Sequence, residues 1–193
     1  MKIILASKSG VRKKILKDNN IICEVVHSNV DEDQAKESFI EADADPTLIS
    51  KNLAELKSTK VSSKHPNTLV IGADSVISLN NKLINKPKDR PEALEILKKL
   101  NGSTHYLISS VCVSLNNSMV WNHTDSSRLK MKFLEEKQLC KYLENIDTKT
   151  LLAYGVYQIE AGGLDLFESI EGDRDSIMGL PIKKLKEYLA QYL

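Results

Sequence analysis

The sequence predicts a mixed α/β fold, in which an elongated sheet is flanked by helices. Short apolar runs typical of strands alternate with segments whose apolar residues recur at helical spacing. Some successive strands are joined by tight turns, as in hairpins, whereas others are separated by a helix. This combination favours a mixed sheet over a strictly parallel one. We expect a single domain over residues 1–193, with a break near 133–150 that would separate two lobes.

The N-terminal part of the chain predicts alternating strands and helices. Residues 2–6 predict a short buried strand, and residues 11–19 predict a helix because their apolar residues share one face. Residues 21–27 predict a second strand, and the polar, acidic residues 28–34 predict a loop. An Asp-Pro pair then starts a helix over 47–64, where apolar residues recur at near-helical spacing.

The middle of the chain predicts two hairpins. An apolar strand over 68–79, interrupted by Gly-Ala-Asp-Ser, returns through residues 82–86 after an Asn-Asn turn. A helix over 90–100 carries proline in its first turn and ends at Asn-Gly. Strands over 104–115 and 119–133 are joined by another short turn.

The C-terminal part of the chain is less regular. Residues 135–144 predict a helix, and Gly-Leu-Pro at 179–181 opens a last amphipathic helix. The segment 152–172 mixes glycine, tyrosine and acidic residues and predicts no regular element. Its tyrosines, Tyr154 and Tyr157, could line a base pocket or pack in the core.

The composition indicates a globular protein and excludes several classes. The 27 Lys and Arg residues nearly balance the 26 Asp and Glu residues, so the basic excess of a general nucleic-acid-binding protein is missing. No apolar run is long enough for a membrane span or a signal peptide. The 3 scattered cysteines indicate neither a disulfide scaffold nor a zinc site. We therefore expect a cytoplasmic protein with no membrane and no nucleic-acid partner.

The segment 7–14 is the first candidate for binding an anion. Small hydroxyl residues and a glycine lie between a predicted strand and a predicted helix, where free N–H groups and the helix dipole attract anions. Arg12 adds a planar cation that suits phosphate, and Lys13 and Lys14 add charge. The spacing of a Walker A loop is missing. Taken alone, an exposed cationic helix face explains the three basic residues more simply.

Two groups of carboxylates could hold a metal or act as a base. Asp31, Glu32 and Asp33 are consecutive, and alone they fit an exposed acidic loop. Asp74 follows an apolar strand, where an unpaired carboxylate is costly when buried, so it is a candidate metal ligand or base. Two carboxylate groups and a basic loop suit metal-assisted phosphate chemistry.

Two lysines are candidates for contacting the same anion. Lys86 precedes a proline that restrains the backbone, and Lys57 lies on the predicted helix beside apolar Leu56. Taken alone, an ordinary surface or loop lysine is the simpler explanation for each of them.

Taken together and in this order, these motifs resemble the Maf family of nucleoside triphosphate pyrophosphatases. The similar segments are LASKSGVRKKIL, VDED, LAELK, the block from GADS to GSTH, IEAGG, and the GD….GLP sequence at 172–181. They span nearly the whole chain. The resemblance implies an inosine-triphosphatase-like (Maf) fold with an elongated mixed sheet and two lobes around a cleft.

The resemblance also implies a role for each matching residue. Asp74 matches the catalytic aspartate of the family, taken as the base, and Glu32 together with Asp74 matches its metal site. The residues that would bind the triphosphate are Ser7, Ser9, Arg12, Lys57 and Lys86. A divalent cation, Mg²⁺ or Mn²⁺, and a cytoplasmic homodimer are implied as well.

Three further positions look like the family's base-selecting positions: Val11, Ser75 and Glu160. Val11 and Ser75 depart from the residues usual there. Glu160 is similar to the glutamate of the 7-methyl-GTP-type enzymes rather than the glutamine of the dTTP/UTP-type enzymes. The resemblance therefore leans toward the 7-methyl-GTP branch, because an ionised carboxylate accepts hydrogen bonds from the N–H groups of guanine.

The predicted activity is a house-cleaning hydrolysis of standard, non-canonical or methylated nucleoside triphosphates to the monophosphate and pyrophosphate. The alternative is a nucleotide-binding regulator of cell division, or septum formation, with little turnover. Asp74 favours catalysis, because binding alone needs the cations but no base. A generic phosphatase is a third hypothesis, made weaker because a Cys-x5-Arg motif is missing.

Overall fold

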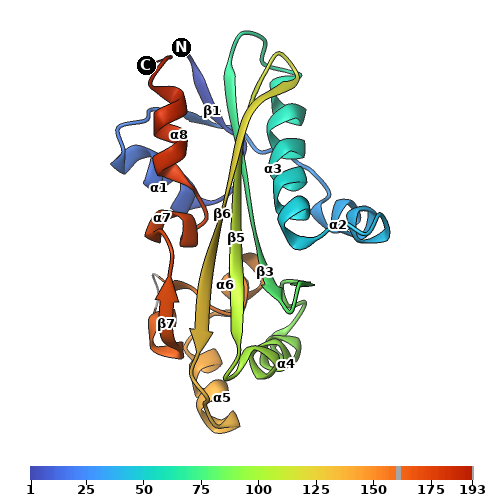
Figure 1. Ribbon diagram of the computed structural model, residues 1–193, viewed down its shortest axis with the longest axis vertical. Coiled ribbons are helices and arrows are strands. Elements are labelled where there is room, and N and C mark those ends of the chain that lie inside the picture. The colour runs from blue at the N-terminus through green and yellow to red at the C-terminus, as the bar shows by residue number, and fades with distance from the viewer. Residues whose placement is uncertain (160–161, 193) are drawn as a thin grey trace. The chain divides into compact units, whose positions relative to one another are not determined.

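The computed structural model describes residues 1–159 and 162–192 and confirms the mixed α/β class (Figure 1). The chain forms two compact units, which are described separately below. Unit 1 comprises Met1–Val76, Ile108–Ser126 and Asp173–Leu193, and unit 2 comprises Ile77–Leu107 and Ser127–Gly172. The break expected near 133–150 is therefore wrong, because that segment lies inside unit 2; the chain passes between the units within long strands instead.

Within the described residues the strands form a seven-stranded sheet in the order β2-β1-β3-β5-β6-β7, with β4 paired to β3. They are β1 (Ile3–Leu5), β2 (Glu24–Val25), β3 (Leu69–Leu79), β4 (Lys82–Ile84), β5 (Thr104–Leu115), β6 (Ser118–Met131) and β7 (Phe167–Glu171). Strand β1 pairs in parallel with β2 and β3, whereas β4 pairs with β3 and β7 with β6 in antiparallel fashion. The expected mixed sheet and the Asn-Asn hairpin are both confirmed.

Helices follow the expected segments, and α2, α6, α7 and η2 are additional to them. They are α1 (Gly10–Asp18), α2 (Glu32–Glu41), α3 (Pro46–Ser62), α4 (Arg90–Leu100), α5 (Glu136–Glu144), α6 (Thr148–Tyr154), α7 (Arg174–Ile177), α8 (Ile182–Leu189) and the 3-10 helix η2 (Gly163–Leu166). None of the helices in the described part of the chain is long and apolar enough to cross a membrane.

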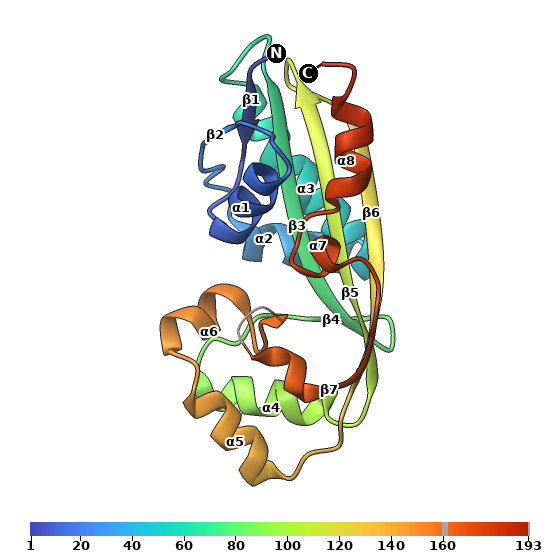
Figure 2. The ribbon, with the colours of Figure 1, turned by 90° about the vertical axis from the view of Figure 1, so that its left-hand side faces the viewer.

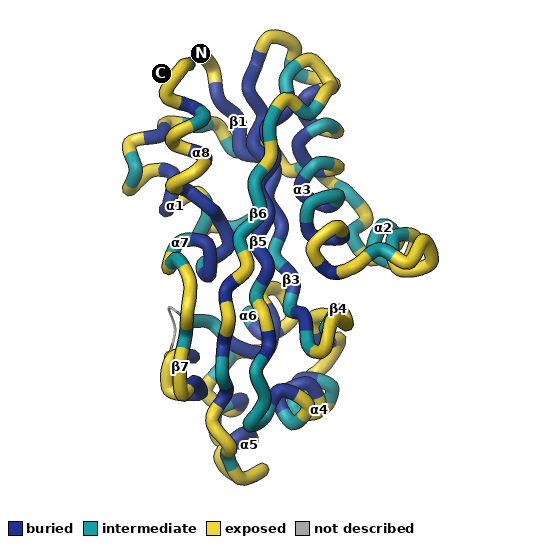
Figure 3. Tube along the Cα trace, in the orientation of Figure 1, coloured by how far each residue is buried: buried dark blue, intermediate teal, exposed yellow. Residues whose placement is uncertain are grey.

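Unit 1 has helices on both faces of its strands. Alternate residues of β1 face opposite sides, so Ile3 and Leu5 pack with α1 and α8, whereas Ile4 packs with Val61 of α3. Figures 1 and 2 show α1 and α8 on one side of β1 and β3, with α3 on the other. Because both faces are covered, β1 is apolar at every position and is buried throughout (Figure 3).

Unit 2 has its own core. Leu97 and Leu100 of α4 pack with Leu129 of β6, Leu139 of α5 and Leu151 of α6. This cluster also contains the rings of Tyr157 and Phe167. Tyr157 is thus a core residue, one of the two alternatives that the sequence left open.

The expected acidic loop at 28–34 is partly wrong, because α2 begins inside it. The side chain of Asp31 accepts a hydrogen bond from the backbone N–H of Gln34 at 3.0 Å and caps the helix. Glu32 and Asp33 then lie in the first turn, where negative charge is favourable. The second strand is also shorter than expected, at Glu24–Val25.

Candidate active site

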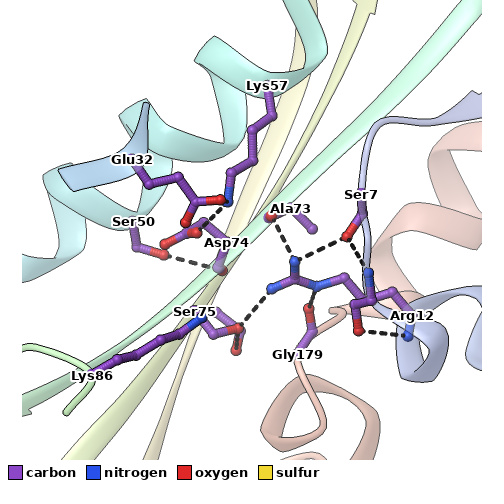
Figure 4. Close-up of polar contacts among 12 residues, drawn as sticks. Ser7, Arg12, Glu32, Ser50, Lys57, Ala73, Asp74, Ser75, Lys86 and Gly179 are labelled. Atoms are coloured by element: carbon purple, nitrogen blue, oxygen red, sulfur yellow. Dashed lines mark hydrogen bonds and ion pairs between the residues drawn. The ribbon is translucent and has the colours of Figure 1, made fainter. Parts of the chain in front are cut away.

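Three charged side chains from three elements of unit 1 meet at one point (Figure 4). Nζ of Lys57, on α3, lies 2.7 Å from Oδ1 of Asp74, on β3, and 2.9 Å from Oε1 of Glu32, at the start of α2. Lys57 and Asp74 are each only 5% exposed, so this ion pair is largely removed from water. The ammonium group of Lys57 thus bridges two carboxylates.

The close approach of α3 to β3 makes this contact possible. The face of α3 that lies against the strand carries Ser50, Ala54 and Ser58, small residues spaced by one helical turn and fully buried. Opposite them is Gly72, where a Cβ atom would overlap the carbonyl oxygen of Ala54 and lie 2.7 Å from the backbone nitrogen of Ser58. Glycine is therefore required at this position, and it continues the strand that was expected to be interrupted there.

The second oxygen of the Asp74 carboxylate has no partner. Oδ2 is buried and accepts no hydrogen bond from the described residues, whereas Oδ1 is held by Lys57. The backbone of Asp74 is fixed as well, because its carbonyl accepts from the hydroxyl of Ser50 at 3.3 Å. A buried carboxylate oxygen without a partner is costly in free energy. A hydrogen bond from water to Oδ2, or contact of Oδ2 with a cation, is therefore favourable.

Arg12 lies in the same unit and holds several backbone groups together. Its Nε donates to the carbonyl of Gly179 at 2.8 Å, and Nη1 donates to the carbonyl of Ala73 at 2.9 Å. Longer contacts run from Nη1 to Oγ of Ser7 at 3.4 Å and from Nη2 to Oγ of Ser75 at 3.3 Å. Among the described residues these contacts leave a hydrogen of Nη2 for a further acceptor.

The charges of this site interact. Burial lowers the pKa of Arg12 below that of a free arginine. The carboxylates of Asp74 and Glu32 offset part of this decrease, because they favour the charged guanidinium. Two cations, Arg12 and Lys57, thus share a small region with two carboxylates. Such a set can accept both an anionic ligand beside the cations and a cation beside the carboxylates.

The start of α1 provides the local geometry for an anion. The side chain of Ser9 caps the helix by accepting from the backbone N–H of Arg12 at 3.3 Å, and Oγ of Ser7 accepts from the N–H of Ser9 at 3.1 Å. No atom lies within 4 Å of the place where a Cβ of Gly10 would be. The first turn is therefore open to a ligand on this side.

The chain matches the family described as Maf-like protein over residues 2–192. The protein belongs to the Maf family. It is 61% identical over 187 residues to the nucleoside triphosphate pyrophosphatase of Pelagibacter ubique, covering 97% of this chain and 96% of that protein. It is 34% identical over 184 residues to the 7-methyl-GTP pyrophosphatase of Rhizobium etli, covering 95% and 92% of the two chains.

A solved structure supports the fold independently. The Ham1 protein of Staphylococcus aureus superposes on this chain with a TM-score of 0.53 at 16% identity, and each chain is covered completely, at 100%. At this identity the likeness concerns the fold alone. The inosine-triphosphatase-like fold expected of a Maf protein is confirmed.

Most of the residues singled out in the sequence lie together in this Maf protein. Unit 1 holds Ser7, Ser9, Arg12, Glu32, Lys57, Asp74 and Ser75. Val11 belongs to the same unit, but it is half-buried and packs against the core of α1 and α8. Lys86 belongs to unit 2, where its Nζ donates to the carbonyl of Ala153 at 2.8 Å. Glu160 lies outside the described residues.

Three functional features escaped the sequence reasoning. Ser50 supports the Asp74 backbone, Ser109 lies with its Oγ 2.8 Å from that of Ser75, and Gly179 accepts from Arg12. The serines of α3 could have been found from the helical repeat of small residues at 50, 54 and 58. Nothing local in the sequence indicates that Gly179 meets Arg12, because the two residues are 167 positions apart.

Among residues 1–159 and 162–192, no group of three or more His, Cys, Asp or Glu side chains is placed to hold a metal ion. The described residues therefore contain no metal site made of protein ligands alone. Glu32 and Asp74 nevertheless fit a hard divalent cation. Magnesium in particular is often bound by one or two carboxylates, and substrate phosphates and water complete its shell. The unpartnered Oδ2 of Asp74 is an oxygen ligand of the right kind.

Proposed function

We propose that this Maf protein hydrolyses nucleoside triphosphates between the α and β phosphates, giving the monophosphate and pyrophosphate. The observation that carries the proposal is the buried carboxylate of Asp74, fixed through Oδ1 and free at Oδ2, beside two buried or half-buried cations. The names of the relatives support the same reaction class, and so does the family to which the chain belongs.

Asp74 acts as the base in this proposal. Its Oδ2 accepts a proton from the attacking water, while Lys57 and Ser50 hold the carboxylate and its backbone in one orientation. Lys57 makes a second contribution, because its ammonium offsets negative charge that builds up when the triphosphate is bound. Glu32 keeps that ammonium in place from the other side.

The remaining cations and the start of α1 bind the phosphates. Ser7 and Ser9 shape the first turn of α1, and the phosphates would bind at this helix N-terminus. Arg12 donates its remaining Nη2 hydrogen to a phosphate oxygen. Lys86 is assigned to the triphosphate by the resemblance to the family, and it would release the carbonyl of Ala153 to do so.

Glu32 and Asp74 would hold a divalent cation, Mg²⁺ or Mn²⁺, when the substrate is bound. The cation supplies charge neutralisation for the phosphate oxygens and lowers the pKa of nearby water. The proposal rests on the donor set, the carboxylate of Glu32 and the unpartnered Oδ2 of Asp74, and on the general need of polyphosphates for hard cations.

Base selection is assigned to Val11, Ser75 and Glu160, with a preference for guanine-type bases such as 7-methylguanine. The carboxylate of Glu160 would accept hydrogen bonds from ring N–H and amino groups. Ser75 acts on the base indirectly, because its hydroxyl already contacts Arg12 and Ser109. Val11 acts through the position of α1, since its side chain packs inward.

We infer the remaining properties from the family resemblance: one domain over residues 1–193, a homodimer and a cytoplasmic location. They stay predictions, and size-exclusion chromatography with light scattering tests the dimer.

A pyrophosphate-release screen tests the proposal. Purified protein with Mg²⁺ is incubated with standard, non-canonical and 7-methylated nucleoside triphosphates, and pyrophosphate and monophosphate are quantified together. We expect pyrophosphate from at least one guanine-type triphosphate. Tight nucleotide binding without pyrophosphate from any member of the panel would instead support a regulatory nucleotide-binding protein.

A further inference from the structure

The carbonyl group of Gly179 is built to lie against Arg12. It accepts from Nε at 2.8 Å, and the glycine has a φ of +104°, which residues with a side chain rarely adopt. A Cβ atom at this position would lie 3.3 Å from Oγ of Ser75 and 3.4 Å from Nε of Arg12. The backbone conformation therefore favours glycine at this position, an added Cβ would make close contacts, and the loop meets the guanidinium through its backbone.

Two hydrogen bonds connect the residue that carries this carbonyl with β6 by way of Ser176. The N–H of Gly179 donates to the carbonyl of Ser176 at 3.0 Å. The hydroxyl of Ser176 donates to Oδ2 of Asp125, on β6, at 2.6 Å. A hydroxyl–carboxylate bond of this length is charge-assisted and among the stronger hydrogen bonds in proteins. Ser176 is 2% exposed, so water competes little for its hydroxyl.

The other contacts of this segment show why it depends on side chains. Helix α7 has only 4 residues, too few to be stable by its own backbone bonds. Asp173 caps it by accepting from the N–H of Ser176 at 3.2 Å and pairs with Lys183. Asp125 is itself held through Oδ1, which lies 2.8 Å from Nε2 of His123. Asp125 thus anchors the segment to the sheet.

We propose that Asp125 and Ser176 are positioning residues that hold the Gly179 carbonyl against Arg12 and so aim the guanidinium at the triphosphate. This inference rests on the proposed function for the role of Arg12 toward phosphate. The hydrogen bond between Arg12 and Gly179 is independent of substrate. Because Arg12 reads phosphate and not the base, the loss of the anchor affects all nucleotides alike.

The test compares Ser176→Ala with Ser110→Ala. Ser110 is a matched control, since it is fully buried and its Oγ lies 2.8 Å from Oγ1 of Thr124 on the same strand as Asp125, without a contact to Arg12. The first readout is the side-chain Nε–H resonance of Arg12 in the ligand-free full chain, assigned with Arg12→Lys. The second is kcat/KM for pyrophosphate release with two nucleotides of different base.

Ser176→Ala should shift the Arg12 Nε–H resonance and speed its exchange with solvent about 10-fold, because the segment loses its bond to Asp125 and the acceptor carbonyl is held less firmly. It should also lower kcat/KM about 10-fold for both nucleotides, the scale of a small misplacement of a catalytic group. Ser110→Ala should leave the resonance and the kinetics unchanged. An unchanged Arg12 resonance in Ser176→Ala overturns the proposal.

A double-mutant cycle separates positioning from general damage. In an Arg12→Lys background the Nε–H group is gone, so Ser176→Ala should have no further effect on kcat/KM. An equal loss in both backgrounds contradicts the proposal.

If the wild type releases no pyrophosphate, the proposed function fails, while the Arg12 resonance still decides whether the anchor exists. If Ser176→Ala does not fold, Asp125→Asn replaces it, because this variant removes the charge of Asp125 and keeps an oxygen acceptor. We then expect a smaller shift of the Arg12 Nε–H resonance. The absence of any shift overturns the proposal.

Discussion

The ammonium nitrogen of Lys57 lies 2.7 Å from Oδ1 of Asp74, and both residues are buried in the same unit. The pair joins a helix to a strand, and Glu32 contacts the same ammonium at 2.9 Å from a third element. One cation therefore keeps two carboxylates close together without repulsion. The arrangement leaves Oδ2 of Asp74 as the unpartnered oxygen on which the proposed chemistry depends.

Removing the shared cation should destabilise the fold. Lys57→Met keeps the apolar stem but leaves the buried carboxylate of Asp74 without a counter-charge, and we expect the free energy of unfolding to fall by about 3–5 kcal/mol. Urea denaturation followed by circular dichroism measures this. Lys51→Met is the matched control on α3, because Lys51 is only partly buried and its ion pair with Glu55 is 3.8 Å long.

The double variant Lys57→Met/Asp74→Asn should recover most of that loss, since both charges are then absent. If Lys57→Met alone is as stable as the wild type, the ion pair between Lys57 and Asp74 is not buried and does not stabilise the fold.

Pyrophosphate release should require a divalent cation. Glu32 and Asp74 offer only oxygen ligands, which suit Mg²⁺ or Mn²⁺ bound together with a triphosphate. Excess EDTA should reduce the rate at least about 100-fold, and added Mg²⁺ should restore it whereas Na⁺ should not. Full turnover in EDTA would remove the metal from the account.

Stability should decline in mild acid because of His105. This histidine of β5 is fully buried, its Nε2 lies 2.9 Å from the hydroxyl of Tyr157, and its Nδ1 has no partner among the described residues. Burial lowers the pKa of His105 from 6.5 to about 4. The unfolded chain therefore binds more protons between these values, so stability is complete above about pH 6.5 and is lost as the pH falls toward 4.

The expected loss over this window is up to about 3 kcal/mol. It is measured from urea midpoints at several pH values. His105→Gln should flatten the dependence, and replacement of the exposed His27 by Gln should not. A wild-type stability that is constant from pH 7 to pH 4 would contradict a neutral, buried His105.

Base preference should change with Glu160. Glu160→Gln replaces an acceptor-only group by one that also donates, so the ratio of kcat/KM for guanine-type over pyrimidine triphosphates should fall by about 10-fold or more. The exposed Glu168→Gln serves as the control and should leave the ratio unchanged. Intact rates with an unaltered ratio in Glu160→Gln would exclude this residue from base selection.

The sequence predicted the long elements well, because they depend on local patterns, and it singled out Glu32, Lys57 and Asp74, which meet in unit 1. Apolar periodicity located α3, α4, β3 and β5 almost to the residue, and Asp74 was conspicuous as a carboxylate inside an apolar run. The sequence analysis did not predict α2. The polar composition of residues 28–34 favours a loop, whereas the side chain of Asp31 caps a helix that begins inside this segment. The four-residue α7 was also missed, since a helix so short depends on tertiary contacts.

Contacts between distant segments could not be predicted. No pattern indicates that Lys57 would lie between Glu32 and Asp74, or that the carbonyl of Gly179 would meet Arg12. These contacts follow from sheet order and from the close approach of α3 at Gly72, which are properties of the packed molecule. Arg12 illustrates the difference: its charge suggested phosphate binding alone, whereas the structure shows that it also ties α1 to β3 and to the segment of Gly179.

The most direct test of the central claim is the product analysis of wild type and Asp74→Asn with Mg²⁺ and the best nucleotide of the screen. The wild type should form monophosphate and pyrophosphate in equal amounts. Asp74→Asn should keep the fold and nucleotide binding but lose at least about 100-fold in kcat, because the amide cannot accept the proton of the attacking water. Formation of diphosphate and orthophosphate by the wild type, or a near-normal rate in Asp74→Asn, would contradict the account.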